Sequence, residues 1–220
     1  LANKDKMLEY SLLVDLKASE NEVDGNDQTI INAFEYLSKY PNINVFVRKR
    51  KFIDGKWQAY ERKRGATDTL NRALLDGNYD AFSFVLRKQR KPNFVLLLDD
   101  DNTLLPGGIK RAVNTMLHPL NAKYTLMTFR SKYRLSSLDT LWSKTYKSDS
   151  GVDGYCNYGD FYYKISGNAI YCGKGIYRLK EYTEQIEGKL PDNRILSHDI
   201  IEGAIVSTGS LALPTYEDAP

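Results

Sequence analysis

Three consecutive aspartates, Asp99, Asp100 and Asp101, have the residue type and spacing to bind a metal ion. They follow the apolar run 94–98, which predicts a strand covered on both faces of a sheet. Open α/β sheets bind ligands at the carboxyl ends of their strands, where these side chains would lie. Adjacent carboxylates repel one another unless a cation or hydrogen-bond donors neutralise them. We therefore expect Asp99 and Asp101 to bind Mg²⁺ or Mn²⁺ with phosphate oxygens, although a solvated loop would use the same residue types.

Two classes of enzyme place an Asp-x-Asp pair after such a strand. In sugar-nucleotide transferases the pair binds a metal that bridges the diphosphate, and in haloacid-dehalogenase-type phosphatases Asp-x-Asp-x-Thr supplies the nucleophile and the acid. Residues 99–103 fit the second motif as written. Against that interpretation, the motif lies in the middle of the chain, and Gly159-Asp160 lacks the second carboxylate of the phosphatase metal loop. The phosphatase stays open as an alternative.

Two further segments could contact phosphates or sugars. The basic segment 61–65 precedes a predicted helix, and its Lys63 and Arg64 could grip a diphosphate, although such charge runs are usually solvated. The turn Gly173-Lys174-Gly175 follows an extended apolar stretch, where glycines let a ligand approach the backbone. It is not a P-loop, because a glycine follows the lysine where that loop has Ser or Thr.

A further acidic segment, ILSHDIIEG, lies near the end of the sequence. Its Ser197 could cap a helix through the backbone of the first turn, which is the structural interpretation. The functional interpretation is that Asp199 or Glu202, at the helix start, removes a proton from an acceptor hydroxyl. The two histidines, His118 and His198, have no serine or cysteine nucleophile beside them, so we expect no catalytic triad.

The elements that would position these residues alternate between strands and helices. Apolar runs that end at turn residues predict strands, and helical spacing bounded by proline predicts helices. We expect strands over 10–14, 45–47, 94–98 and 124–129, extended stretches at 161–166 and 169–171, and helices over 28–40, 67–75, 107–117, 135–146 and 180–187. A turn is expected at Asp54-Gly55, within a basic excursion. This order predicts an α/β fold.

Length and composition fit one domain, 1–220, better than two. The 220 residues are 42% hydrophobic and 12% aromatic, enough for a sizeable core. A net charge of +3 without a recognised binding motif does not predict a nucleic-acid partner.

The cysteines and the start of the sequence bear on where the protein acts. Cys156 and Cys172 match no zinc spacing and no disulfide framework, which favours a reducing compartment. No run reaches the length of a membrane-spanning helix, and the start lacks both methionine and a signal pattern, so we expect a fragment of a larger protein.

Five short segments together resemble the glucosyltransferase domain of the cyclic β-1,2-glucan synthases, and they occur in that family's order. They are 60–65, 98–101 with 105–106, 116–121, 173–177 and 195–199. The resemblance as a whole spans nearly the entire chain, from Leu12 to Tyr216. It implies a GT-A-type fold, with a Rossmann-like, mixed and mostly parallel sheet flanked by helices, and an inverting transferase that uses a UDP-sugar. It also implies that the protein acts at the cytoplasmic face of the bacterial inner membrane. Contact with the membrane would be made by parts of the protein outside this chain.

The resemblance implies a role for each matching position. The donor would contact Asp15, Lys63, Arg64 and Asp99, with Asp99 and Asp101 on Mg²⁺ or Mn²⁺. Asp199 would be the base, and the acceptor would border Gly173, Lys174, Gly175, Tyr177 and His198. Asn102 departs from the family, whose Asp-rich loop is shorter, and this leaves the metal ligand among the three aspartates open.

The implied reaction is a single displacement. Asp199 would deprotonate the 2-hydroxyl of a growing β-1,2-glucan, which attacks the anomeric carbon of UDP-glucose with inversion. Two alternatives remain: a Mg²⁺-dependent phosphatase that uses Asp99 and Asp101, and a non-catalytic transferase-like domain that binds glycan. Hydrolysis of UDP-glucose would separate the three.

Overall fold

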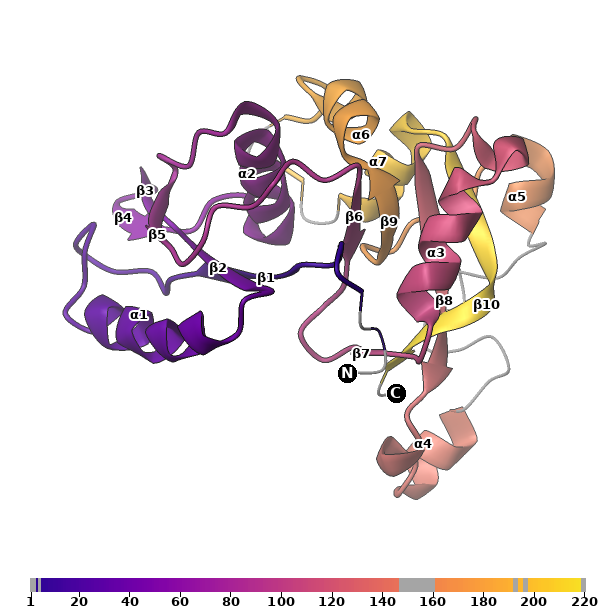
Figure 1. Cartoon of the computed structure of the whole chain (residues 1–220), viewed down its shortest axis with the longest axis horizontal. Helices are drawn as coiled ribbons and strands as arrows, with labels where there is room; N and C mark the ends of the chain where they lie inside the picture. Colours follow the sequence, from indigo (N-terminus) through magenta and orange to yellow (C-terminus); the bar gives the residue numbers. More distant parts are fainter. Residues whose placement is uncertain (1–2, 4, 147–160, 192–193, 196–197, 219–220) are drawn as a thin grey trace. The chain divides into compact units, whose positions relative to one another are not determined.

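The computed structural model describes residues 3, 5–146, 161–191, 194–195 and 198–218, along which strands and helices alternate (Figure 1). The chain divides into two compact units. The amino-terminal unit contains residues 5–92 and 191–196, and the carboxyl-terminal unit contains residues 1–4, 93–190 and 197–220. Each unit has a mixed sheet flanked by helices, which confirms the predicted α/β class. That residues 1–220 act as a single catalytic domain stays a prediction.

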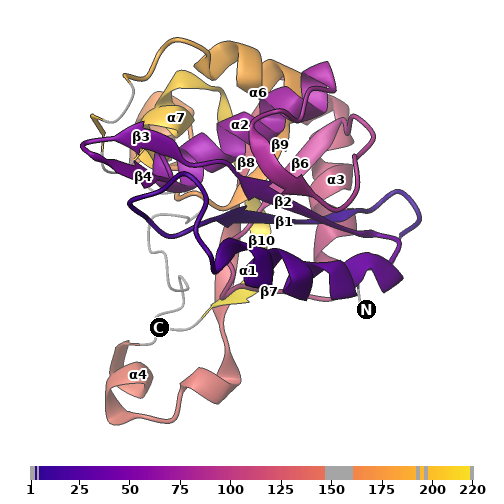
Figure 2. The same ribbon diagram turned by 90° about the vertical axis from the view of Figure 1, so that its left-hand side faces the viewer.

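A three-stranded sheet forms the centre of the amino-terminal unit. Its order is β1-β2-β5, with β1 parallel and β5 antiparallel to β2. Helices α1 and α2 lie on opposite sides of this sheet (Figure 2). Successive side chains of β2 point to opposite faces of the sheet. Val45 and Val47 pack with Phe34 of α1, while Phe46 stacks on Tyr79. The bounds are β1 Tyr10–Asp15, α1 Asp27–Glu35, a 3₁₀ turn Tyr36–Lys39, β2 Ile43–Arg48, α2 Arg62–Asp76 and β5 Phe82–Val85.

The basic excursion after β2 is a hairpin whose cations are partly used inside the fold. Strands β3 (Lys51–Ile53) and β4 (Lys56–Gln58) pair around Asp54 and Gly55, which both have positive φ, so the expected turn is confirmed. Just before β3, Arg50 donates to both carboxylate oxygens of Asp27 at 2.6 and 2.8 Å. These bonds hold the pKa of Asp27 below its ordinary value. Arg50 therefore belongs to a buried ion pair and not to a solvated charge run.

A five-stranded sheet in the order β6-β9-β8-β10-β7 forms the centre of the carboxyl-terminal unit. Its β8–β10 pair is parallel, and the other three pairs are antiparallel. Helix α3 contributes Met116 to a core shared with Met127, Phe129, Ile176 and Tyr216. The bounds are β6 Phe94–Leu97, β7 Thr103–Leu104, α3 Gly108–Leu117, β8 Leu126–Tyr133, α4 Leu141–Tyr146, α5 Phe161–Ser166, β9 Gly175–Arg178, α6 Leu179–Ile186, α7 Asp199–Ile205 and β10 Thr208–Asp218.

Two expectations about the sheets are corrected. The mixed character is confirmed, but most strand pairs are antiparallel, since only β1–β2 and β8–β10 among the described pairs run parallel. Strand β6 lies at an edge of the five-stranded sheet and its residues are only partly buried. An uninterrupted apolar run is therefore not a sign of a central strand here. Its apolar side chains pack against the core of α3, β8 and β9 from the edge.

Three local expectations also differ from the structure. Residues 161–166 form the helix α5, in which the Ser166 hydroxyl donates to the Tyr162 carbonyl one turn earlier, and not an extended segment. Residues 169–171 are in no strand. The helix expected over 135–146 is interrupted, because Thr140 and Ser143 exchange hydrogen bonds that start α4 afresh. Of the helices that the structure describes, none has the length and apolar character to cross a membrane.

Candidate functional site

A tight turn holds the aspartates that follow β6. The backbone N–H of Asp99 donates to Oδ1 of Asn102 at 3.1 Å, and the Asn102 N–H returns a bond to the Asp99 carbonyl at 3.3 Å. Nδ2 of Asn102 also donates to Oδ1 of Asp101 at 3.1 Å. Arg134 fixes the same turn by donating to the Asp101 carbonyl at 2.5 Å. Asn102, which departs from the expected pattern, thus orders Asp99 and Asp101 together with Arg134.

Lys174 lies between two carboxylates of this unit. Its Nζ is 3.4 Å from Oδ2 of Asp99 and 3.8 Å from Oδ2 of Asp218, the last residue of β10. The Lys174 side chain is 13% exposed and the Asp218 side chain 7%, whereas that of Asp99 is 33% exposed. Lys174 therefore brings a positive charge to Asp99, on the side of the site predicted to bind phosphate.

Gly173 supports the carboxylate of Asp199. It has φ +76°, and a Cβ placed on it would lie 2.8 Å from Oδ2 and 3.1 Å from Oδ1 of Asp199. Only glycine combines this backbone conformation with so close an approach. The turn of Gly173 and Lys174 thus contacts Asp199 through its first residue and Asp99 through its second. Four of the predicted site residues are brought together in one unit.

Buried tyrosines lie behind these carboxylates. Tyr171 is fully buried, and its pKa is raised well above its ordinary value by burial and then by the charges of Glu202, Asp199 and Asp99. Tyr182 donates to Oε2 of Glu202 at 2.8 Å. Because burial raises the pKa of both tyrosines, Tyr171 and Tyr182 stay protonated beside the acidic groups of the site.

Two predicted acceptor contacts have a different place. Tyr177 is 0% exposed and stacks on Tyr182 at 4.3 Å, so its ring lies in the core, out of reach of a sugar. Gly175 begins β9, and a Cβ there would lie 2.6 Å from the Met127 carbonyl of β8, so this glycine serves strand packing. We do not retain either as an acceptor contact.

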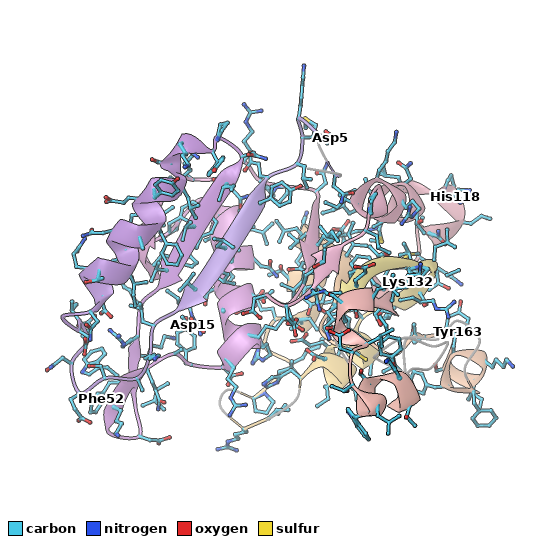
Figure 3. All side chains as sticks on the ribbon, turned by 90° about the horizontal axis from the view of Figure 1, so that it is seen from below. Asp5, Asp15, Phe52, His118, Lys132 and Tyr163 are labelled. Carbon is cyan, nitrogen blue, oxygen red and sulfur yellow. The ribbon has the colours of Figure 1, made fainter. Side chains whose placement is uncertain are left out.

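The two histidines lie at helix ends. His198 precedes the first residue of α7 and is 9% exposed, while Ser197, the expected cap, lies outside the described residues. His118 follows α3 (Figure 3), and its Nδ1 accepts from the Leu120 N–H at 3.3 Å. His118 therefore has a structural role in the turn that follows α3.

In the amino-terminal unit, Asp15 is paired with an arginine that the sequence did not single out. Asp15 lies at the end of β1 (Figure 3). It pairs in register with Arg48 of β2, and the two side chains form a bidentate ion pair with both bonds at 2.7 Å. Nη2 of Arg48 also donates to the Tyr60 carbonyl at 2.8 Å, and its guanidinium stacks on the Tyr60 ring. Asp15 keeps 26% of its side chain exposed. One face of this carboxylate is therefore fixed while part of it stays accessible to a ligand.

The predicted diphosphate segment begins α2 with an unusual backbone. Glu61 and Arg62 have φ +57° and +43°, a conformation that costs a non-glycine residue of the order of 1 kcal/mol each. Nε of Arg64 donates to Oε2 of Glu61 at 3.1 Å. The side chain of Lys63 is half-buried. Such local strain is typical of places where a side chain must be aimed at a ligand. Lys63 and Arg64 thus share one helix start, in the same unit as Asp15.

Gly65 permits this helix start. A Cβ at Gly65 would lie 2.3 Å from Cβ of Glu61, 2.6 Å from the Tyr60 carbonyl and 2.9 Å from Nη1 of Arg48. Gly65→Ala should therefore lower the free energy of unfolding by about 2 kcal/mol even after the gain in helix propensity, and lower Tm by about 4–8 °C. Gly25→Ala is the control in the same unit, because nothing lies within 4 Å of that position and its φ is not positive. Equal Tm values for the two variants would contradict the crowding at Gly65.

The aspartate turn fits a metal that binds together with a donor. Among the described residues, no group of three or more His, Cys, Asp or Glu side chains is placed to hold a metal ion. If Asp99 and Asp101 were its ligands, most coordination positions of the metal would be left to diphosphate oxygens and water. Mg²⁺ is commonly bound in this way, by one or two carboxylates together with substrate phosphates. The ammonium of Lys174 beside Asp99 would share the charge of the same phosphates. Residues and expected cofactor are therefore compatible.

Comparison with known proteins connects the sequence to one biosynthetic enzyme. The chain matches no known protein-family profile. It is similar to the cyclic β-(1,2)-glucan synthase NdvB of Rhizobium meliloti (strain 1021), with 28% identity over 169 residues. The match covers 69% of this chain and 6% of that protein, so the chain spans only a small part of the relative's length. The chain is thus related, over that part, to a cyclic β-(1,2)-glucan synthase.

Proposed function

We propose that this chain is the donor-binding and catalytic part of an inverting glucosyltransferase of the GT-A type. The donor would be UDP-glucose and the acceptor a growing β-1,2-glucan. One observation carries the proposal: the Gly173-Lys174 turn contacts Asp199 and Asp99, to which the family resemblance gives the roles of base and donor contact. The relationship to a glucan synthase supports the same class of reaction.

In the proposed reaction, Asp199 accepts the proton of the acceptor 2-hydroxyl as its oxygen attacks the anomeric carbon. The bond from that carbon to the diphosphate oxygen breaks, the configuration inverts, and UDP leaves with the electron pair. A bound Mg²⁺ or Mn²⁺ would stabilise the charge that develops on UDP. Lys174 would add its charge beside Asp99. We accordingly propose Lys174 as a donor contact, leaving Gly173 and His198 at the acceptor.

The remaining parts of the proposal concern the amino-terminal unit and the cell. Asp15 would contact the nucleotide, while Lys63 and Arg64 at the start of α2 would contact the diphosphate. The bidentate bond to Arg48 supports this use of Asp15, since a fixed carboxylate loses little freedom on binding a ligand. We further propose action at the cytoplasmic face of a membrane, with membrane contact made outside this chain.

Calorimetric titration with UDP tests the donor site. We expect UDP and UDP-glucose to bind with Mn²⁺ present and to lose at least tenfold in affinity when it is chelated, because the diphosphate is the main partner of the metal. Asp101→Ala should cause a similar loss in the presence of Mn²⁺. Asp100→Ala is the matched control, since Asp100 is exposed in the same turn. If Asp101→Ala bound UDP in the presence of Mn²⁺ as tightly as the wild type and Asp100→Ala do, Asp101 would be removed from the metal site.

Assays on the same protein distinguish the transferase from the two alternatives, a phosphatase and a non-catalytic glycan-binding domain. Release of phosphate from p-nitrophenyl phosphate with Mg²⁺, without UDP binding, would favour the phosphatase that uses Asp99 as nucleophile. Binding of β-1,2-glucan without any UDP binding or UDP-glucose hydrolysis would favour a non-catalytic glycan-binding domain. Metal-dependent UDP binding together with UDP-glucose hydrolysis is the outcome that the transferase requires.

A further inference from the structure

The helix that carries Asp199 is too short to keep its own orientation. Helix α7 spans seven residues, Asp199–Ile205, and isolated helices of this length do not persist in water. Asp199 lies in its first turn, where the carboxylate must stay over Gly173. The contacts that α7 makes with other elements must therefore set the position of this carboxylate.

One such contact is a buried hydrogen bond to Glu202. Glu202 lies one turn after Asp199 and is 6% exposed, and its Oε2 accepts from the Tyr182 hydroxyl at 2.8 Å. Burial raises the pKa of Tyr182 well above its ordinary value, so the phenol keeps the proton that it donates. A buried carboxylate without a hydrogen-bond donor would be costly, which makes this contact specific for one placement of the helix.

Tyr182 is itself held rigidly. It belongs to α6, which lies beside β9 (Figure 1), and its ring stacks on that of Tyr177 at 4.3 Å with 28° between the planes. Tyr177 is fully buried in β9. The series Tyr177, Tyr182, Glu202 therefore connects the five-stranded sheet to α7 through side chains that have little freedom to move.

A second contact fixes the other side of α7. A Cβ on Gly203 would lie 2.7 Å from Cβ and 3.3 Å from the backbone nitrogen of Tyr171, so the helix backbone approaches that residue closely. The Thr208 hydroxyl donates to the Gly203 carbonyl at 2.8 Å. With its backbone held at Gly203 and its side chain held at Glu202, α7 has one rotational setting about its axis, and this setting directs Asp199 toward Gly173.

We propose that the Tyr182–Glu202 hydrogen bond positions Asp199 for proton abstraction. Tyr182 and Glu202 are positioning residues that act through Asp199, and neither is assigned a contact with donor or acceptor. The inference rests on the proposed role of Asp199 as base. It explains why the motif carries two acidic residues one turn apart, of which one faces the site and the other is buried.

A double-mutant cycle on the full-length protein tests the catalytic part. Tyr182→Phe removes the hydroxyl and keeps the ring that stacks on Tyr177. We expect it to lower kcat for glucose transfer by about tenfold, the effect of one hydrogen bond to a carboxylate, with the donor KM unchanged within about twofold. Glu202→Gln keeps an oxygen that can accept from Tyr182 but loses the charge that strengthens the bond, so it should lower kcat in the same direction and by less. In the Asp199→Asn background, neither change should lower the residual rate further.

Tyr163→Phe is the control for loss of a tyrosine hydroxyl. It removes a 3.2 Å bond to Tyr124 that involves no residue of α7, and it should leave kcat unchanged. Equal losses from Tyr182→Phe in the wild-type and Asp199→Asn backgrounds would show a general structural effect and overturn the inference. If Asp199→Asn itself transferred glucose at the wild-type rate, the proposed base would be wrong.

Amide hydrogen exchange tests the positioning independently of activity. In Tyr182→Phe, amides of α7 should exchange about tenfold faster, while those of β8 and β9 keep their protection. Unchanged exchange in α7 would overturn the inference whatever the transfer assay reports. Faster exchange in α7 with an active Asp199→Asn variant would leave the positioning role standing and reject only the proposed base.

Discussion

Asp199→Asn should lower the rate of glucose transfer by about 10²–10⁴-fold, the usual contribution of a general base. The amide has nearly the shape of the carboxylate and cannot accept the proton of the acceptor hydroxyl. Because the Asp199 side chain lies over Gly173, whereas Lys174 pairs with Asp99 and Asp218, the donor side should be unaffected. The measurement is kcat with UDP-glucose and glucan in the full-length protein.

Two controls accompany this variant. Calorimetric binding of UDP with Mn²⁺ should match the wild type within about twofold, which separates loss of chemistry from loss of donor binding. The Tm should change little, because Asp199 is not buried and the Tyr182–Glu202 bond of α7 is retained. A variant that transfers glucose at near the wild-type rate would reject Asp199 as the base.

Gly173→Ala should reduce transfer by about 10²-fold through displacement of the same carboxylate. The new methyl group would stand 2.8 Å from Oδ2 of Asp199, so the carboxylate must move, and a shift of about 1 Å at a reacting group can cost this much in rate. The alanine would also have to adopt φ +76°, which costs about 1–2 kcal/mol of stability. Initial rates and Tm should be measured on the same preparation.

Gly188→Ala separates these two effects. Gly188 lies in the same unit with φ +70°, but nothing is within 4 Å of the position that its Cβ would take. It should lose a similar amount of stability and retain full transfer activity. If Gly188→Ala were as inactive as Gly173→Ala, backbone strain alone would account for the loss, and the contact with Asp199 would have no part in it.

The sequence predicted those features of the fold and the candidate site that depend on local pattern. Helical spacing before Pro191 identified α6, and an apolar run identified β6 with Asp99 after its end. The acidic segment near the end of the sequence identified Asp199 at the start of α7. These signals come from periodicity and from residues that begin or end an element, so they can be read without knowing the tertiary structure.

Features that depend on tertiary contacts could not be predicted in this way. The pairing of Lys174 with Asp99 and Asp218 joins the beginnings and ends of three strands that are distant in sequence. The burial of Tyr177 follows from its place in β9, which no alternation in the sequence revealed. Residues 161–166 are rich in aromatic side chains, which favour strands, yet they form α5, a helix without a buried residue, so the strand preference of these residue types did not decide their structure.

Strand β10 has a consequence for how the carboxyl-terminal unit folds. It pairs Thr208 with Leu126 in β8 and Tyr216 with Leu104 in β7, and the Thr215 carbonyl accepts from Leu105 just after the aspartate turn. These contacts join residues far apart in the sequence, which gives the unit a high contact order and a slow folding step. During synthesis, β8 can pair with its parallel partner β10 only after residues 208–218 have left the ribosome. The aspartate turn and Lys174 would therefore gain their final neighbours late, and a nascent chain arrested before β10 should be protease-sensitive around residues 99–105.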